Sequence, residues 1–211
     1  MKDYQKSTLQ AYDDGVDKYQ ASASEMVNLA EINKLISFAP HKYKAVLDVG
    51  CAFGKETAVF NSKGWEAIGI DFSREFIKRA KKLHPTLKFK HMDMLELQFK
   101  PESFSAVWSN AVLHHLKDED VIKALKEFHR VLKPEGVFGV SFKKGEGSEE
   151  IVESFSSNGK RFYKYQTEEN IKQLLGLEDF KLLDMYVLNE RKNFGPQYRD
   201  LDWLWVFARK A

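Results

Sequence analysis

Short apolar runs alternate with segments of helical periodicity between residues 44 and 143 of this 211-residue chain. The apolar runs predict strands, and the positions between them recur at the spacing of amphipathic helices. We expect strands at residues 45–49, 67–71, 87–91, 104–108 and 136–142, and helices near residues 54–63, 73–83 and 118–132. Such βαβαβ alternation predicts a parallel sheet, and right-handed crossovers place helices on both of its faces.

The N-terminal stretch has a different pattern. Residues 1–38 are polar and helical in their spacing, and Pro40 ends the pattern. The apolar positions that recur at helical spacing are Met26, Leu29, Ile32 and Ile36. We interpret residues 1–40 as an N-terminal helical lid or cap, and residues 41–211 as a single globular domain.

The C-terminal third predicts one further helix and two strands. The helix begins at Thr167, and the strands cover residues 182–188 and 203–208. Residues 189–202 between these strands show no helical pattern, and a direct connection favours antiparallel pairing. We therefore expect an α/β fold with a doubly wound, mostly parallel, seven-stranded sheet that ends in an antiparallel hairpin.

Composition and charge narrow the classes of function. Lys and Arg number 33 and Asp and Glu 31, so a net charge of +2 does not favour nucleic acid as a partner. The single cysteine, Cys51, excludes an internal disulfide framework and a cysteine-clustered zinc site. No apolar run approaches the roughly 20 residues of a membrane helix, and the first residues lack a signal-peptide core. We expect a cytoplasmic protein with no metal and no membrane partner.

The clearest chemical signal is the turn after the first predicted strand. Residues 46–55 read VLDVGCAFGK, so Asp48 precedes a turn with small residues at positions 50, 52 and 54. Small residues let the backbone approach a ligand closely, and doubly wound sheets bind ligands at this end of their strands. A second acid, Asp71, ends the next strand 21 residues after Gly50, where it suits the hydroxyls of a ribose.

Two kinds of cofactor bind at turns of this general form, and the residues distinguish between them. A dinucleotide-binding turn needs G-x-G-x-x-G, but its positions here hold Gly50, Ala52 and Lys55, so two of the three glycines are absent. The carboxylate of Asp48 would repel a pyrophosphate and attract an amino group. The residues therefore favour a nucleoside cofactor with an ammonium-bearing tail and no phosphates.

Five motifs, in this order, resemble those of the class I S-adenosylmethionine-dependent methyltransferases, notably the small-molecule and quinone-biosynthesis type. The D-x-G-x-G-x-G signature corresponds to residues 48–54, with Ala52 in place of the middle glycine. The other four motifs correspond to Asp71–Phe72, Met92–Asp93–Met94, residues 104–116 and residues 127–137. The resemblance covers residues 42–143, and it implies a Rossmann-like fold with S-adenosyl-L-methionine as the cofactor.

The resemblance also implies roles for single residues at the cofactor. Asp48 and the backbone from Gly50 to Gly54, with Cys51 and Ala52 between them, hold the methionine moiety. Asp71 takes the ribose hydroxyls. The residues assigned to the adenine are Phe72 against its face, Asp93 on its amino group, and the backbone of Met94, next to Met92 of the same motif, on the ring edge.

The end of the fourth strand and the N-terminal stretch complete this implied site. Ser109, Asn110 and Ala111 line the methionine end near the reactive methyl. Tyr19 is the candidate lid residue, because a sulfonium cation gains about 0.5–2 kcal/mol beside an aromatic face.

The catalytic residue is unknown from the sequence, and the substrate contacts are candidates only. His114 and His115 suit a proton acceptor, but a packing role suits them equally, and His114 also suits the lining of a substrate pocket. The long connections at residues 143–165 and 189–202 are further candidate regions for substrate contacts, because irregular segments of this length seldom lack a function. Their candidate substrate-binding residues are Arg161, Tyr163, Arg191 and Tyr198.

We therefore expect an enzyme that transfers a methyl group from S-adenosylmethionine to a small-molecule acceptor by direct in-line displacement. Orientation supplies about 7–11 kcal/mol of such a barrier and a general base only about 10²–10⁴-fold in rate, so the lack of an evident base does not argue against an enzyme. The alternatives are a methyltransferase of protein or tRNA, a non-catalytic cofactor-binding or scaffolding protein, and a nicotinamide oxidoreductase, which the missing glycines disfavour.

Overall fold

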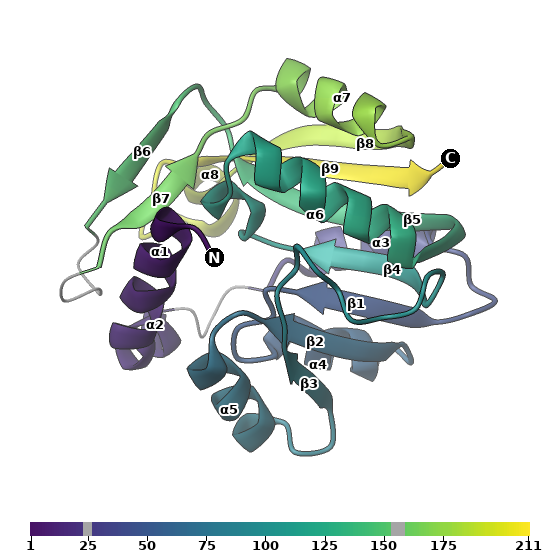
Figure 1. The fold of residues 1–211 in the computed structure, drawn as a ribbon, viewed down its shortest axis with the longest axis horizontal. Helices are drawn as coiled ribbons and strands as arrows, with labels where there is room; N and C mark the ends of the chain where they lie inside the picture. Colours follow the sequence, from purple (N-terminus) through teal and green to yellow (C-terminus); the bar gives the residue numbers. More distant parts are fainter. Residues whose placement is uncertain (23–26, 153–158) are drawn as a thin grey trace.

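A mostly parallel seven-stranded sheet forms the centre of the computed structural model, which describes residues 1–22, 27–152 and 159–211. The strand order is β3-β2-β1-β4-β5-β9-β8, and β9 runs antiparallel to both of its neighbours (Figure 1). The strands are β1 (Ala45–Val49), β2 (Glu66–Asp71), β3 (Lys88–His91), β4 (Phe104–Ser109), β5 (Leu132–Lys143), β8 (Phe180–Asn189) and β9 (Asp202–Lys210). The expected doubly wound sheet with its antiparallel hairpin is confirmed.

Helices cover both faces of this sheet (Figure 1). On one face lie α6 (Asp118–Val131) and α7 (Glu168–Leu177), and on the other lie α3 (Leu29–Phe38) and α4 (Lys55–Ser62). A fifth helix, α5 (Arg74–Leu83), packs along β2 and β3. None of the helices in the described ranges is long and apolar enough to span a membrane.

The N-terminal stretch forms separate helices that lie on different parts of the molecule. Two of them, α1 (Asp3–Asp14) and α2 (Val16–Ser22), lie beside the carboxyl ends of the parallel strands (Figure 1). In contrast, α3 packs against β5, where its Ile32 and Leu35 are fully buried. Met26, an apolar position of the expected pattern, lies outside the described residues.

Two connections that we expected to be irregular contain regular structure. The first holds an antiparallel pair, β6 (Ser148–Ile151) and β7 (Arg161–Lys164), and the second holds the short helix α8 (Glu190–Phe194). Both depend on contacts outside the local sequence pattern, because β7 is covered by α1 and the buried Glu190 is bound by Arg199 and Trp203. Local periodicity gives no sign of such contacts.

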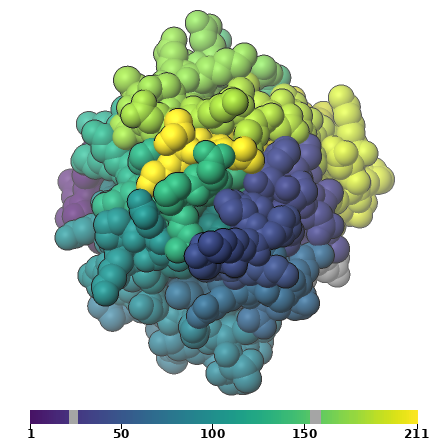
Figure 2. Space-filling view, turned by 90° about the vertical axis from the view of Figure 1, so that its right-hand side faces the viewer, coloured from purple at the N-terminus to yellow at the C-terminus, as the bar shows by residue number. Residues whose placement is uncertain are grey.

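The end of the sheet away from α1 is the face shown in Figure 2. The segment before β1 (indigo), the start of β5 (green) and the C-terminal residues (yellow) meet there, and α1 (purple) is visible only at the margin. The parallel strands begin at this end and point toward α1 and α2 (Figure 1). Any ligand at their carboxyl ends therefore lies next to the N-terminal helices.

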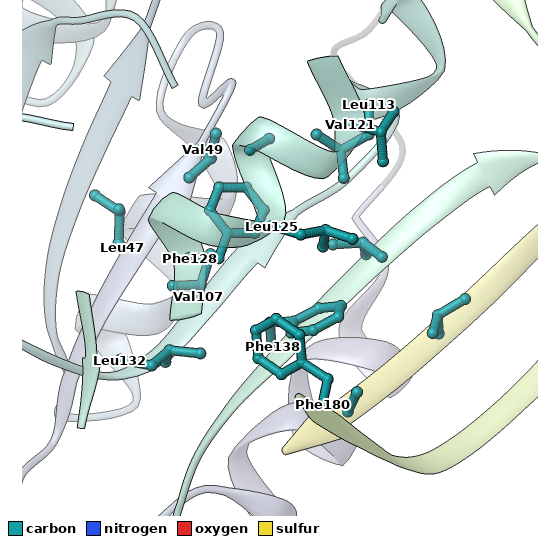
Figure 3. Close-up of a cluster of buried hydrophobic side chains, with 14 of the residues drawn as sticks. Leu47, Val49, Val107, Leu113, Val121, Leu125, Phe128, Leu132, Phe138 and Phe180 are labelled. Atoms are coloured by element: carbon teal, nitrogen blue, oxygen red, sulfur yellow. The ribbon is translucent and has the colours of Figure 1, made fainter. Parts of the chain in front are cut away.

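The larger hydrophobic cluster joins the sheet to α6. Figure 3 shows Phe128 of α6 between Val49 and Val107, with Leu125 beside it and Phe138 of β5 below. The side chains of Phe128 and Phe138 are almost completely buried. This packing fixes β1 and β4 side by side, so their carboxyl ends hold a constant relation to each other.

Replacing Phe128 with alanine is expected to lower the free energy of unfolding by about 3–5 kcal/mol, because it removes a fully buried ring and leaves a cavity. Leu177→Ala is the control, since that side chain is 64% exposed and its loss should change stability by no more than about 0.5 kcal/mol. Urea denaturation followed by circular dichroism measures both. Equal effects of the two substitutions would contradict the assigned core.

Candidate functional site

A cleft opens at the carboxyl ends of the parallel strands and is closed on one side by α1 and α2. It holds about 900 Å³ of space not filled by protein atoms, including its open mouth. Clefts of this size bind small molecules and cofactors. The lining residues are Gly50 and Ala52 after β1, Asp71, Phe72 and Ser73 at β2, Phe76 of α5, Asp93 and Met94 after β3, Asn110, Ala111 and Val112 after β4, His115 and Leu116 next to them, and Gln5, Thr8, Leu9, Tyr12 and Tyr19 from the N-terminal helices.

The turn after β1 takes a left-handed backbone at three positions. The φ angles are +73° at Gly50, 45° at Ala52 and +80° at Gly54. The amides of Gly50 and Cys51 both donate to the carbonyl oxygen of Ile70, at 2.8 and 2.9 Å, which ties the turn to β2. A Cβ on Gly50 would lie 2.2 Å from a methyl carbon of Val112, so only glycine allows the turn to approach the end of β4 so closely.

Asp71 is fixed between this turn and the start of α5. Its Oδ2 accepts from the amide of Ala52 at 3.0 Å, and its Oδ1 accepts from the amide of Ser73 at 2.8 Å. Burial raises the pKa of Asp71 to about 6, although these two amides act in the opposite direction. The carboxyl therefore lies at the cleft wall with both oxygens held in place.

Asp48 lies beneath the turn, outside the cleft lining, and is paired with a second acid. Its side chain accepts from the hydroxyl of Thr57 at 2.5 Å. Glu56, on the first turn of α4, accepts from Trp108 Nε1 at 2.6 Å and from Asn110 Nδ2 at 3.0 Å. Burial and the neighbouring Glu56 raise the pKa of Asp48, and burial raises that of Glu56. The neighbouring Lys55 acts in the opposite direction on the pKa of Glu56. Asp48 and Glu56 therefore place two acidic side chains behind this end of the cleft.

The third strand contributes Asp93 and Met94 to the cleft lining. Oδ1 of Asp93 accepts from the amide of Leu95 at 2.9 Å, which orients the carboxyl at the start of the loop. Met92, the third member of the predicted motif, is buried in the hydrophobic core. Phe72 also lines the cleft and stacks on His91, with ring centroids 6.0 Å apart.

The end of β4 is held by a short hydrogen-bond network. Ser141 Oγ donates to Asn110 Oδ1 at 2.8 Å and accepts from the amide of Ala111 at 2.8 Å. Asn110 and Ala111 line the cleft, whereas Ser109 is buried behind them. Of the three residues predicted at the end of β4, Asn110 and Ala111 therefore form part of the cleft wall, and Ser109 lies behind it.

An aromatic cluster closes the cleft from the N-terminal side. Tyr19 stacks on Phe76 at 5.5 Å between centroids, and Tyr12 meets Tyr19 edge to face at 5.2 Å. Phe53, from the turn after β1, lies 4.9 Å from Phe76. Tyr19, the predicted lid residue, thus lies at the cleft, and Tyr12 lies there with it.

The two candidate histidines have different surroundings. His115 lines the cleft, and burial lowers its pKa to about 3. His114 is not among the lining residues, and it packs against Tyr163 and Trp203 at 5.4 and 5.3 Å between ring centroids. Burial holds the pKa of His114 well below its usual range, and this favours a neutral ring.

The four candidate substrate residues fall into two groups. Arg161 and Tyr163 are buried on β7 behind the cleft wall, and Arg161 Nη1 donates to the hydroxyl of Tyr12 at 2.9 Å. Arg191 lies in α8 and Tyr198 follows this helix, and Arg191 Nε donates to the carbonyl oxygen of Tyr198. Neither of these two residues lines the cleft.

Sequence reasoning missed Tyr12, Phe76 and Glu56. Tyr12 and Phe76 reach the cleft only because α1 and α5 pack together around it, and Glu56 is engaged only because α4 meets the ends of β1 and β4. The tyrosine content of the first 20 residues was the one available signal. Across the described ranges, no three His, Cys, Asp or Glu side chains are grouped so that they could hold a metal ion.

Gly50→Ala is expected to destabilise the protein more than Gly64→Ala. Both glycines are left-handed, so each substitution costs about 1–2 kcal/mol in backbone strain. A Cβ at Gly64 meets no atom within 4 Å, whereas one at Gly50 overlaps Val112 and adds about 1–3 kcal/mol. Denaturation of both variants measures the difference, and equal losses would show that the turn and Val112 are not in close contact.

The stability contributed by Asp71 is expected to depend on pH. The carboxyl has a pKa of 3.8 when unperturbed and about 6 in the folded protein, so the folded state binds this proton more tightly. Its contribution is complete below about pH 4 and is lost as pH rises through about 6. Relative to Asp71→Asn, the wild-type free energy of unfolding should therefore fall over that window. Urea denaturation from pH 4 to 7 measures this, with Glu146→Gln as the exposed control, and a flat difference would contradict the assignment.

Comparison with known proteins finds methyltransferases that are similar to this chain. Residues 47–140 match the family described as a methyltransferase domain. The 2-methyl-6-phytyl-1,4-hydroquinone methyltransferase of Synechocystis is 38% identical over 100 residues, which are 46% of this chain and 31% of that protein. An uncharacterized methyltransferase of Oceanobacillus iheyensis is 28% identical over 171 residues, which are 78% of this chain and 76% of that protein. The chain thus spans about a third of the first relative and three-quarters of the second.

A solved structure has the same fold over the full length of the chain. The 1,6-didemethyltoxoflavin-N1-methyltransferase of Burkholderia thailandensis, with bound 1,6-didemethyltoxoflavin and S-adenosylhomocysteine, aligns with a TM-score of 0.72 at 21% identity. The alignment covers 100% of this chain and 91% of that protein. Residues 47–140 thus match a methyltransferase domain, and the whole chain has the Rossmann-like fold of the S-adenosylmethionine-dependent methyltransferases.

Proposed function

We propose that this protein binds S-adenosyl-L-methionine in the cleft and transfers its methyl group to a small-molecule acceptor. The observation that carries the proposal is the charge of the cleft wall. Asp71 and Asp93 line it, and none of the described lining residues is a Lys or an Arg. A sulfonium with an ammonium tail fits such a wall, whereas a diphosphate would meet carboxylates without a cation to bind it.

The backbone of the turn after β1 supports the same cofactor. Gly50 and Ala52 expose a left-handed backbone to the cleft, so a ligand can approach within contact distance there. Asp71 has both carboxylate oxygens held in place, an arrangement that suits the two hydroxyls of a ribose. Gly54, Cys51 and Asp48 shape this turn from behind, and in our proposal they act on the methionine moiety through it.

The other lining residues are assigned to parts of the cofactor according to the order of the strands in the sheet. We assign Asp93, the backbone of Met94 and the ring of Phe72 to the adenine, because they lie at the ends of β3 and β2. Asn110 and Ala111, at the end of β4, are assigned to the methionine end and the reactive methyl. Since β1 lies between β2 and β4, this order extends the cofactor across the adjacent carboxyl ends of the sheet.

The N-terminal helices act as the cover in this proposal. Five residues from α1 and α2 line the cleft, and α1 is joined to α5 by a hydrogen bond from Ser73 to Asp13 and to α6 by one from Tyr4 to Asp120. A cover excludes water from the reacting atoms. We therefore assign the lid to residues 3–22 within the N-terminal 40 residues.

The bound cofactor would supply the methyl group on a sulfonium, which is already a good leaving group. The protein would supply orientation, since holding the acceptor in line is worth about 7–11 kcal/mol. The names of the curated relatives support a small-molecule acceptor over a protein or tRNA, and the intact turn supports an enzyme over a scaffold. Action in the cytoplasm, expected from the sequence, belongs to the same proposal.

Asp71→Asn is expected to weaken binding of S-adenosylhomocysteine by about 10- to 100-fold, because a hydrogen bond to a charged group contributes about 1.5–3 kcal/mol. The matched control is Glu66→Gln, which removes a carboxylate at the other end of the same strand. Isothermal titration calorimetry at pH 7.5 measures both affinities. Unchanged affinity in Asp71→Asn would refute the placement of the ribose.

A further inference from the structure

A row of hydrogen bonds crosses the cleft wall next to the end of β4. Arg161 Nη1 of β7 donates to the hydroxyl of Tyr12 at 2.9 Å, and this hydroxyl lies 2.8 Å from His115 Nε2. On the far side of the ring, His115 Nδ1 lies 2.7 Å from the carbonyl oxygen of Phe162. The row thus joins α1, β7 and the short helix at residues Leu113–His115.

The chemistry of these groups fixes the direction of each hydrogen bond. A carbonyl oxygen only accepts, so His115 Nδ1 carries a hydrogen, and a neutral ring then has its lone pair on Nε2. A guanidinium only donates, so the Tyr12 oxygen accepts from Arg161 and its own hydrogen points to His115 Nε2. A basic nitrogen is therefore connected to the cleft through the tyrosine hydroxyl.

This row of hydrogen bonds lies at the end of the cleft where, in the proposed function, the methyl acceptor binds. Tyr12 and His115 both line the cleft, and they do so beside Ala111 and Val112 after β4. The adenine and ribose residues of the proposed function lie at the ends of β3 and β2, across β1 from this position. A molecule that contacts Tyr12 is thus at the methionine end.

We propose that the methyl acceptor is a hydroxyl compound, and that its proton leaves through Tyr12 to His115. The inference rests on the proposed function, because it requires a methyl donor in the same cleft. Tyr12 and His115 are its catalytic residues, and Arg161 with the carbonyl of Phe162 positions them.

The step balances without any further reactant. The acceptor oxygen forms its bond to the methyl carbon as the carbon–sulfur bond breaks, and that electron pair stays on sulfur. The acceptor proton passes to the Tyr12 oxygen while the tyrosine proton passes to His115 Nε2. The resulting imidazolium keeps its Nδ1 hydrogen bond to Phe162 and afterwards releases one proton to water.

The weak basicity of His115 favours oxygen as the acceptor atom. Arg161 and Tyr163 of β7, Lys143 of β5, Tyr12 of α1 and the adjacent His114 face the ring, and burial lowers its pKa to about 3. Such a base does not ionise a hydroxyl in advance. It does accept the proton of a hydroxyl that is being methylated, because an oxygen carrying both groups is a far stronger acid than imidazolium.

The first experiment tests the proton positions in the free protein. Nitrogen-15 NMR of the histidine side chains, assigned with His115→Gln, should show a neutral His115 ring protonated at Nδ1 from pH 5 to pH 8. A ring protonated at Nε2, or an imidazolium at pH 7, would overturn the proposal because Nε2 would then have no lone pair for the proton.

The second experiment tests transfer with defined probes. Catechol and hydroquinone serve as hydroxyl acceptors, and 4-methylpyridine serves as a nitrogen acceptor that carries no proton. His115→Gln should lower kcat on the hydroxyl probes by about 10²–10⁴-fold, and Tyr12→Phe should lower it at least tenfold, with affinity for S-adenosylhomocysteine unchanged. The wild-type rate should also fall in D₂O, and this isotope effect should be absent in Tyr12→Phe. His41→Gln and Tyr43→Phe, exposed at the other end of the molecule, are the matched controls.

The outcomes separate this inference from the proposed function. If S-adenosylhomocysteine does not bind, the proposed function fails. If it binds but neither hydroxyl probe is methylated, or if 4-methylpyridine is methylated and the hydroxyl probes are not, the hydroxyl acceptor is wrong. If His115→Gln and Tyr12→Phe keep wild-type kcat on the hydroxyl probes, the proton route is wrong.

Discussion

The close approach of the turn after β1 to the end of β4 is the constraint on which the site depends. Gly50 has no room for a Cβ against Val112, and its amide and that of Cys51 are held by the carbonyl of Ile70. This contact brings the ends of β2, β1 and β4 into one wall, and it requires the left-handed backbone of the turn. The core between the sheet and α6 holds β1 and β4 in register, so packing far from the cleft fixes its geometry.

The acidic side chains in and behind this cleft wall determine which ligands bind there. Asp71 is held by two amides, and Asp48 and Glu56 lie behind the turn in contact with hydroxyl, indole and amide donors. Burying carboxylates costs free energy, and the raised pKa values of Asp71 and Asp48 express that cost. A ligand that brings positive charge and hydroxyl donors recovers part of that cost. A diphosphate would add to it, because no described lining residue is a Lys or Arg.

Local patterns were sufficient to predict the sheet and the turn, because Asp48, Gly50 and Asp71 stand next to strand ends that periodicity identifies. The N-terminal tyrosines could be noticed but not ranked, so Tyr19 was selected and Tyr12 was not. Their positions depend on how α1 packs against β7 and α5, contacts between residues far apart in the chain. The pairing of β6 with β7 and the helix at Glu190 were missed because their partners lie outside the local pattern. Helix α1 packs on β7, and Glu190 accepts hydrogen bonds from Arg199 and Trp203, 9 and 13 positions further along the chain.

We conclude that the cleft receives a cationic nucleoside across the ends of β3, β2, β1 and β4. A crystal structure of the protein grown with S-adenosylhomocysteine in one drop and NAD in another tests it most directly. We expect adenosylhomocysteine with its ribose hydroxyls on Asp71 and its amino-acid tail beside the Gly50 turn, and no bound NAD. An NAD molecule with its diphosphate on that turn, or a cleft that side chains fill in both crystals, would contradict it.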